Sequence, residues 1–334
     1  MNKKSGNALN SMRNESAVPS VSSIPMSRWA RSKRLAHRIA FGRHGLRAGW
    51  SVILSIAIFW GIGFVSTPVA RHLILAMKDS SVNLMAHQTV GYLLFAARIA
   101  VTIFVMAKIE RRKFLDFGFR GDARVIRLIS GLIAGFTSIS LLVLLLWKLD
   151  LLQISGPTLH MTTLFAYALA WGGFMVIVAF TEESIFRGYA QFTLGRSLGF
   201  GWTALLLSAA FGALHGGNPG ETPVGRYVAM AVGLMLSLSV WYTGSLWWAM
   251  GFHAAWDWGE SYFYGTPDSG GVSVGRLFTA TAQGNPILSG GTTGPEGSAL
   301  SFGLVVLLMA LMWLWWGRRT RSPFSGNAWR PARS

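Results

Sequence analysis

The most constraining feature of the sequence is a series of apolar runs that begins just after Arg47 and continues almost to the carboxyl end. A helix needs about 20 mainly apolar residues to cross the hydrocarbon of a bilayer. The sequence therefore predicts an all-α, polytopic membrane helix bundle of about eight transmembrane helices. The expected spans are 50–69, 89–107, 128–147, 163–180, 202–214, 228–242, 246–256 and 300–316.

The composition excludes a soluble globule. Hydrophobic residues make up 51% of the chain and charged residues only 13%, too few to solvate so much apolar sequence. The fifteen Trp and 39 Gly are typical of membrane proteins, in which Trp gathers at the interface and Gly is frequent in the helices. Since the chain has no Cys, disulfides, thiolate metal sites and cysteine nucleophiles are excluded.

The basic residues indicate orientation, because Lys and Arg concentrate in cytoplasmic loops. They cluster in residues 1–47, 108–127 and 318–333, so both termini are expected in the cytoplasm and the net charge of +17 does not indicate nucleic-acid binding. We expect a basic, partly disordered tail at 1–47, a transmembrane domain at 48–318 and a basic tail at 319–334. Residues 26–47 form either an amphipathic helix on anionic lipid or a simple positive anchor. The stretch 268–298 is expected to be a flexible external loop without chemistry of its own.

Ionisable side chains within apolar helices are costly and usually functional. In the predicted spans, or directly against them, they are Arg98, Glu182, Glu183, His215, His253 and Asp257, with Glu260 one turn further along. The runs 202–214 and 246–256, next to His215 and around His253, are short and Gly-rich. We expect these two helices to be buried among the others or broken near a site.

Glu183 and Arg187 are four residues apart and can pair on one face of a helix. Glu182 is rotated from Glu183 by about 100°, so the two carboxylates can take different roles. The alternative is a cytoplasmic helix end with ordinary solvated charges.

His215 shares a helix face with Phe211, and His253 shares one with Asp257. Singly, each has a structural interpretation: His215 caps a helix end, and His253 and Asp257 satisfy one another. Together with the two glutamates they are the groups that a buried site needs to activate water, either as general bases or as ligands of a metal. No Ser or Cys stands beside a base, so nothing supports a covalent mechanism.

Three motifs follow one another on these helices: Glu182-Glu183-x-x-x-Arg187, Phe211-x-x-x-His215 and His253-x-x-x-Asp257. Their order resembles that of the CPBP family, which comprises the type II CAAX prenyl proteases and the bacteriocin-processing (Abi) intramembrane proteases. The resemblance covers about residues 111–260. It implies an eight-helix bundle and endoproteolysis, which in the CAAX branch removes a carboxyl-terminal tripeptide from a prenylated protein. The third motif ends here in Asp257, whereas the CAAX branch has Asn.

Carried over by position, the resemblance implies that Glu182 and His215 activate water. It also implies that His253 and Asp257 complete the catalytic site, either as oxyanion stabilisers or as part of a metal-binding set. Glu183 and Arg187 become a structural pair. The implied cofactor is either none or one divalent metal ion, with zinc possible and Glu182, His215 and His253 as its ligands; the metal-free version is favoured. The implied partners are the lipid bilayer and a membrane-associated protein or peptide substrate, and the implied location is the inner membrane of a bacterial cell.

Two other functions remain open on the sequence. One is a non-catalytic membrane partner or bacteriocin-immunity protein of the same fold, and the other is a proton-linked transporter. Hydropathy also places Glu182 and His215 at opposite ends of successive spans. For the two to meet, the fourth helix must continue through Arg187 toward Leu194, or both helices must tilt around a water-filled cavity.

Overall fold

The computed structural model describes residues 45–75, 81–157 and 159–318, together with positions 29, 32, 37 and 39–42. The chain divides into two compact units, Met1–His44 and Gly45–Ser334. The short strand β1 (Phe41–Gly42) belongs to the first unit, and every element below belongs to the second. Most of the predicted basic tail 1–47, including about half of the possible amphipathic helix, lies outside the described residues, as does the tail 319–334.

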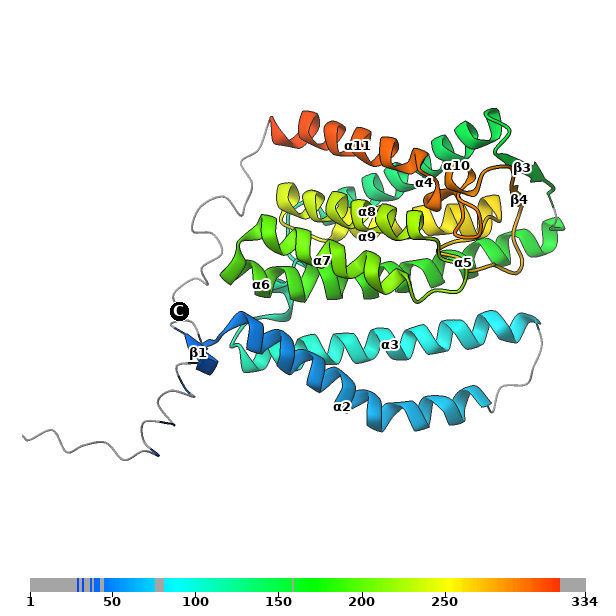
Figure 1. Ribbon diagram of the computed structural model, residues 1–334. Helices are drawn as coiled ribbons and strands as arrows, with labels where there is room; N and C mark the ends of the chain where they lie inside the picture. Colours follow the sequence, from blue (N-terminus) through cyan, green and yellow to red (C-terminus); the bar gives the residue numbers. More distant parts are fainter. Residues whose placement is uncertain are drawn as a thin grey trace, which may run out of the picture. The chain divides into compact units, whose positions relative to one another are not determined.

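The described part of the second unit is a helical bundle with three short strands (Figure 1). After β2 (Gly45–Leu46), its helices are α2 (Ala48–Leu75), α3 (Ser81–Ile109), α4 (Arg124–Lys148), α5 (Met161–Glu183), α6 (Gln191–Leu198), α7 (Phe200–His215), α8 (Pro223–Thr243), α9 (Trp247–Trp258), α10 (Pro286–Ser289) and α11 (Leu300–Met312). Short segments of other helix types are the 3₁₀ turns η1 (Phe114–Asp116) and η4 (Pro295–Gly297) and the π-helical segments η2 (Ser184–Ala190), η3 (Gly259–Tyr264) and η5 (Trp313–Gly317). The strands β3 (Leu152–Ser155) and β4 (Thr279–Ala282) pair antiparallel.

Six helices in the described part of the chain are long and apolar enough to cross a membrane. They are Ala48–His72, Ala86–Ile109, Arg124–Lys148, Thr163–Leu198, Pro223–Thr243 and Leu300–Gly317. The prediction of an integral, polytopic helix bundle is therefore confirmed. The predicted number of eight is approximate, because the runs at 202–214 and 246–256 correspond to the shorter helices α7 and α9.

One long helix resolves the apparent separation of Glu182 and His215. The π turns of η2 join α5 to α6 across a kink at Gly188, so that the helical path continues to Leu198. Gly199, whose φ of 77° suits glycine, then reverses the chain into α7. Glu182 and His215 lie at nearly equal distances along the chain from this turn, about 25 Å at 1.5 Å per residue. The hairpin of α6 and α7 therefore brings both residues to one level.

Helix α9 packs so closely against α4 that the two backbones are in contact. A Cβ added at Gly131 would lie 2.3 Å from the carbonyl oxygen of Trp248, and one at Gly135 would lie 2.1 Å from that of Phe252. On α9, a Cβ at Gly251 would lie 2.3 Å from the carbonyl oxygen of Leu128. Small residues at such positions let membrane helices approach closely, which strengthens their dispersion contacts.

Residues 265–299, here called the cap, fold back onto the end of the bundle at which α7 ends and α8 begins. Gly270 N donates to Thr293 O at 3.0 Å. Thr222, the residue before α8, donates from its backbone N to Thr293 Oγ1 at 2.8 Å. Trp171 of α5 donates from Nε1 to Val274 O at 2.9 Å. The stretch 268–298, expected to be a flexible loop, forms hydrogen bonds with α5 and with the residue that precedes α8.

We predict that Gly135→Ala destabilises the protein by about 1–3 kcal/mol or more, because its Cβ would displace the α9 backbone. The control Gly61→Ala is expected to change the free energy of unfolding in the opposite direction, with a stabilisation of up to about 1 kcal/mol. A Cβ at Gly61 meets nothing within 4 Å, and alanine favours the helix. Thermal unfolding in detergent measures both; a stabilised Gly135→Ala protein would contradict the close helix contact.

Candidate active site

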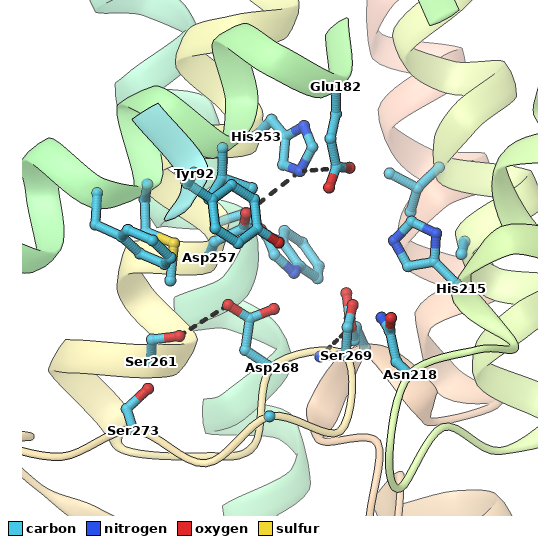
Figure 2. A pocket seen from close by; sticks show the side chains of 18 of the residues that line it. Tyr92, Glu182, His215, Asn218, His253, Asp257, Ser261, Asp268, Ser269 and Ser273 are labelled. Carbon is cyan, nitrogen blue, oxygen red and sulfur yellow. Dashed lines mark hydrogen bonds and ion pairs between the residues drawn. The ribbon is translucent and has the colours of Figure 1, made fainter. Parts of the chain in front are cut away.

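A cavity of about 390 Å³ opens among α3, α5, α7, α8, α9 and the cap (Figure 2). The four residues predicted to be catalytic all line it, although they come from three separate helices: Glu182, His215, His253 and Asp257. Arg98, the other ionisable residue of the predicted spans, does not line it. Its guanidinium lies instead over the ring of Phe59, 3.8 Å from the centroid.

The two neighbouring glutamates face different surroundings, as the rotation between successive helix positions requires. The side chain of Glu183 is fully buried, whereas that of Glu182 keeps 24% of its surface exposed in the cavity. The π turns of η2 begin immediately after Glu183. Such turns are frequent at functional sites because they change the direction in which side chains leave a helix.

A buried chain of charged groups runs from α5 to α9. Arg187 Nη1 donates to Glu183 Oε1 at 2.9 Å, and His253 Nδ1 lies 3.0 Å from the same oxygen. On its other side, His253 Nε2 lies 3.3 Å from Asp257 Oδ2 and 3.8 Å from Glu182 Oε2. Because ionised carboxylates only accept hydrogen bonds, an imidazole that donates from both nitrogens satisfies this arrangement.

His215 is oriented in a different way. Its Nδ1 lies 2.8 Å from the carbonyl oxygen of Phe211, one helical turn earlier. A carbonyl can only accept, so Nδ1 carries a hydrogen, and in the neutral ring Nε2 is then the acceptor. The ring of Phe211 also packs against the His215 ring, with centroids 4.3 Å apart. The second motif therefore presents an imidazole whose unprotonated nitrogen can accept a proton.

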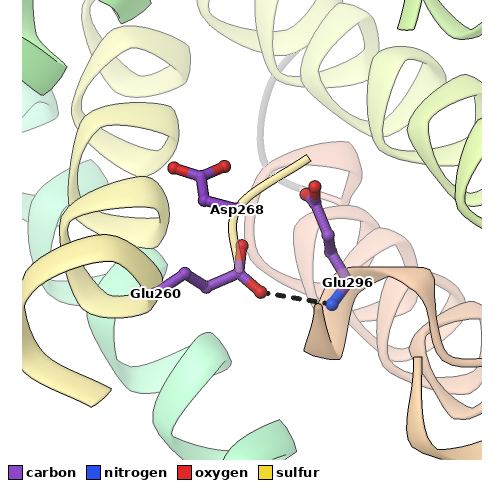
Figure 3. A group of neighbouring side chains, drawn as sticks. All are labelled: Glu260, Asp268 and Glu296. Atoms are coloured by element: carbon purple, nitrogen blue, oxygen red, sulfur yellow. Dashed lines mark hydrogen bonds between the residues drawn. The ribbon is translucent and has the colours of Figure 1, made fainter. Parts of the chain in front are cut away.

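The predicted metal set does not fit the side chains as they lie. Glu182, His215 and His253 line one cavity, but both ring nitrogens of His253 are turned to carboxylates. To bind a metal, His253 would have to release one of these partners. In the described part of the chain, the one group of carboxylates close enough to share a cation is a different set, Glu260, Asp268 and Glu296, whose oxygens lie within 4.8 Å of one another (Figure 3).

The cap contributes carboxylates to the cavity that sequence reasoning missed. Asp268, Ser269 and Glu296 line the cavity, and Ser269 donates from both its N and its Oγ to Glu296 Oε1 at 2.7 Å. Glu260 Oε1 accepts the backbone N–H of Glu296 at 3.2 Å. The stretch 268–298, which we expected to have no chemistry of its own, thus brings polar groups to the cavity. A signal was available, since Asp268 and Glu296 are two of only 13 acidic residues in the chain.

The carboxyls of the cap hold their protons more tightly than usual. Burial raises the pKa of Asp268 well above its ordinary range, and the charges of Asp257 and Glu296 add to the effect. Burial also raises the pKa of Glu296 from 4.5 to about 7, although its hydrogen bond from Ser269 opposes the shift. The cap therefore loses negative charge as the pH falls toward the acidic range.

Comparison with known proteins finds one family model that part of the chain matches. Residues 163–259 match the family model described as type II CAAX prenyl endopeptidase Rce1-like. These residues form an Rce1-like segment. The match confirms the family resemblance drawn from the three motifs, and it supports a protease, that is, a hydrolase of peptide bonds. Comparisons with curated proteins and with solved structures found no match.

The Rce1-like segment contains all three motifs but not the whole cavity. It extends from α5 to the end of α9 and so includes Glu182, His215, His253 and Asp257. Helix α3 and the cap lie outside it. Tyr92 of α3 and the carboxylates of Asp268 and Glu296 therefore come to the cavity from parts of the chain that the family match does not cover.

We predict that Glu183→Gln lowers stability far more than Glu182→Gln does. Glu183 is the buried partner of both Arg187 and His253, and breaking a buried ion pair costs about 3–5 kcal/mol. Glu182 Oε2 has no hydrogen-bond partner among the described residues. Thermal unfolding of the two variants in the same detergent tests this, and equal losses would contradict the structural role of Glu183.

We also predict that stability falls as the pH rises from about 4.5 to 7 and that Glu296→Gln weakens this fall. A carboxyl whose pKa is higher in the folded than in the unfolded protein binds more protons in the folded state. Its contribution to the free energy of unfolding is therefore fully present below the unfolded pKa. This contribution is lost as the pH rises through the folded pKa. Asp268 acts in the same direction. Unfolding midpoints at several pH values measure the slope, with the exposed Asp122→Asn as control; an unchanged slope in Glu296→Gln would refute the assignment.

Proposed function

We propose that the protein is an intramembrane endopeptidase in which Glu182 and His215 activate water to hydrolyse a peptide bond of a membrane-associated protein or peptide. The observation that carries the proposal is the pairing of two free acceptors in one cavity. The Glu182 side chain keeps 24% of its surface exposed in the cavity, and the hydrogen on His215 Nδ1 leaves Nε2 as the acceptor of the neutral ring. Figure 2 shows the two side chains facing each other across the open space.

The geometry supports a direct attack by water. A water between Glu182 and His215 gives up a proton to this pair while its oxygen forms a bond to the carbonyl carbon. The electron pair of the carbonyl moves onto its oxygen. When the tetrahedral intermediate collapses, the C–N bond breaks and the amine nitrogen takes the proton back. General acid–base assistance of this kind contributes about 10²–10⁴-fold to the rate.

His253 and Asp257 are positioning residues that hold the Glu182 carboxylate in place. His253 stands between Glu183, Asp257 and Glu182, so its positive charge holds the Glu182 carboxylate at the cavity wall. Asp257 accepts from His253 and thereby fixes the ring from the other side. An Asp at this position orients a histidine, a role that does not require it to donate a hydrogen bond.

The surroundings of the site are part of the same proposal. The apolar helices place it within a bilayer, and the distribution of Lys and Arg favours cytoplasmic termini in a bacterial inner membrane. The cavity wall is aromatic and apolar on one side, with Trp171, Phe174 and Met175, and carboxylate-rich on the other. This suits an extended peptide that carries an apolar or lipidated group.

The test uses purified protein in lipid vesicles with two quenched fluorescent probes. One probe ends in a farnesylated cysteine followed by three residues, and the other is an unlipidated transmembrane peptide. We expect cleavage of one of them, and a loss of kcat of about 10²–10⁴-fold in Glu182→Gln and in His215→Gln.

The control variant is Asp122→Asn, which replaces an exposed acid outside the cavity. It should cleave at the wild-type rate. Failure of the wild-type protein to cleave either probe, or full activity in Glu182→Gln, would overturn the proposal. The first result would favour the non-catalytic membrane partner, and the second would show that another group activates the water.

A further inference from the structure

We infer that Tyr92 of α3 supplies the hydrogen bond that stabilises the oxyanion formed during peptide hydrolysis. The inference rests on the function proposed above. It assigns a catalytic role to a residue outside the Rce1-like segment, on a helix in which the sequence singled out only Arg98.

The starting point is a shortage of donors among the motif residues. The attack of water places a negative charge on the former carbonyl oxygen, and a preorganised donor within about 2.7–3.1 Å must receive it. His253 already faces Glu183 with one ring nitrogen and Asp257 with the other. Asp257, as a carboxylate, only accepts. His215 donates from Nδ1 to the Phe211 carbonyl. None of these groups has a free N–H or O–H for the oxyanion.

Tyr92 has such a donor. It lines the cavity, and Figure 2 shows its hydroxyl pointing into the space below the Glu182 carboxylate. Within the described residues, no group exchanges a hydrogen bond with this hydroxyl. Two hydroxyls of the cavity are already occupied, since Ser261 donates to Asp268 and Ser269 donates to Glu296. Asn218 also lines the cavity and is the competing donor that the test below must separate from Tyr92.

The ring of Tyr92 is held so that its hydroxyl keeps one direction. It packs edge-on against Phe174 of α5, with centroids 5.1 Å apart and an interplanar angle of 78°. On α3 itself it packs edge-on against Phe95 at 6.4 Å and 77°. Edge-to-face contacts of this kind fix the ring plane. A rigid donor that needs no reorganisation during the reaction is what electrostatic stabilisation of a transition state requires.

The chemistry of the step is balanced without proton transfer from Tyr92. The proton of the attacking water goes to the Glu182 and His215 pair, and the carbonyl electron pair goes to the oxygen that faces Tyr92. The phenol keeps its proton and donates a hydrogen bond that strengthens as the charge develops. Because the neutral carbonyl of the bound substrate gains less from the same bond, the phenol should affect kcat more than KM.

The test is Tyr92→Phe, which keeps the ring and removes only the hydroxyl, assayed with the probe that the wild-type protein cleaves. We expect kcat to fall about 10²–10³-fold, the loss typical of one oxyanion donor, with KM nearly unchanged. A phosphinate analogue of the probe, which mimics the tetrahedral intermediate, should bind more weakly by a similar factor. The control Tyr264→Phe removes a hydroxyl outside the cavity and should leave kcat unchanged.

The outcomes separate this inference from the proposed function. If Glu182→Gln is inactive while Tyr92→Phe keeps its kcat, the inference is wrong and the proposed function stands. If Asn218→Ala, and not Tyr92→Phe, loses kcat, the donor is Asn218 and the inference is again wrong. Full activity in Glu182→Gln would overturn the proposed function itself.

A second measurement covers the case in which Tyr92→Phe fails to fold. Replacing Tyr92 by 3,5-difluorotyrosine keeps the size and hydroxyl of the side chain but makes the phenol more acidic. A hydrogen-bond donor to the oxyanion should then change kcat several-fold, while binding of the probe stays the same. An unchanged kcat would overturn the inference.

Discussion

The buried contact of Glu183 with Arg187 and His253 is the interaction on which the site depends. Charged groups within a bilayer are tolerated only when they are paired, and a carboxylate with two cationic partners meets this condition. The contact also joins α5 to α9 across the cavity. The same oxygen of Glu183 thus neutralises a guanidinium, sets the orientation of an imidazole and fixes the height of one helix against the other. Glu182 can remain without a hydrogen-bond partner because its neighbour carries the structural role.

This contact requires that α9 be surrounded by protein, which the glycine positions of α4 make possible. Side chains at Gly131 and Gly135 would separate the two backbones, and a Cβ at Gly251 would do the same from the other side. The motifs of the Rce1-like segment therefore depend on α4, which lies before that segment in the chain. The geometry of the cavity therefore belongs to the whole bundle.

The sequence predicted much of this arrangement and missed a definable part. The apolar runs predicted the helix bundle, and the spacing of Glu183 and Arg187 predicted their pairing. The level of Glu182 against His215 could not be read from hydropathy, because the polar groups of η2 look like the end of a span. They are in fact inside one long helix. Tyr92 was missed because a tyrosine in an apolar run has no distinguishing pattern. The roles of Asp268 and Glu296 depend on how the cap folds back, which loop composition does not specify.

The shortness of α7 has a consequence for the lipid around the protein. A helix of this length, Phe200–His215, spans about 24 Å, whereas the hydrocarbon of a bilayer is about 30 Å thick. Polar backbone at that depth is tolerated only where protein covers it, and the cap provides this cover on the side of α7 that faces the cavity. On the side of α7 that faces lipid, the lipid chains must shorten or tilt. The protein should therefore thin the bilayer locally and favour thin membranes, and a substrate segment that is too short to span a normal bilayer would find its best match beside the cavity.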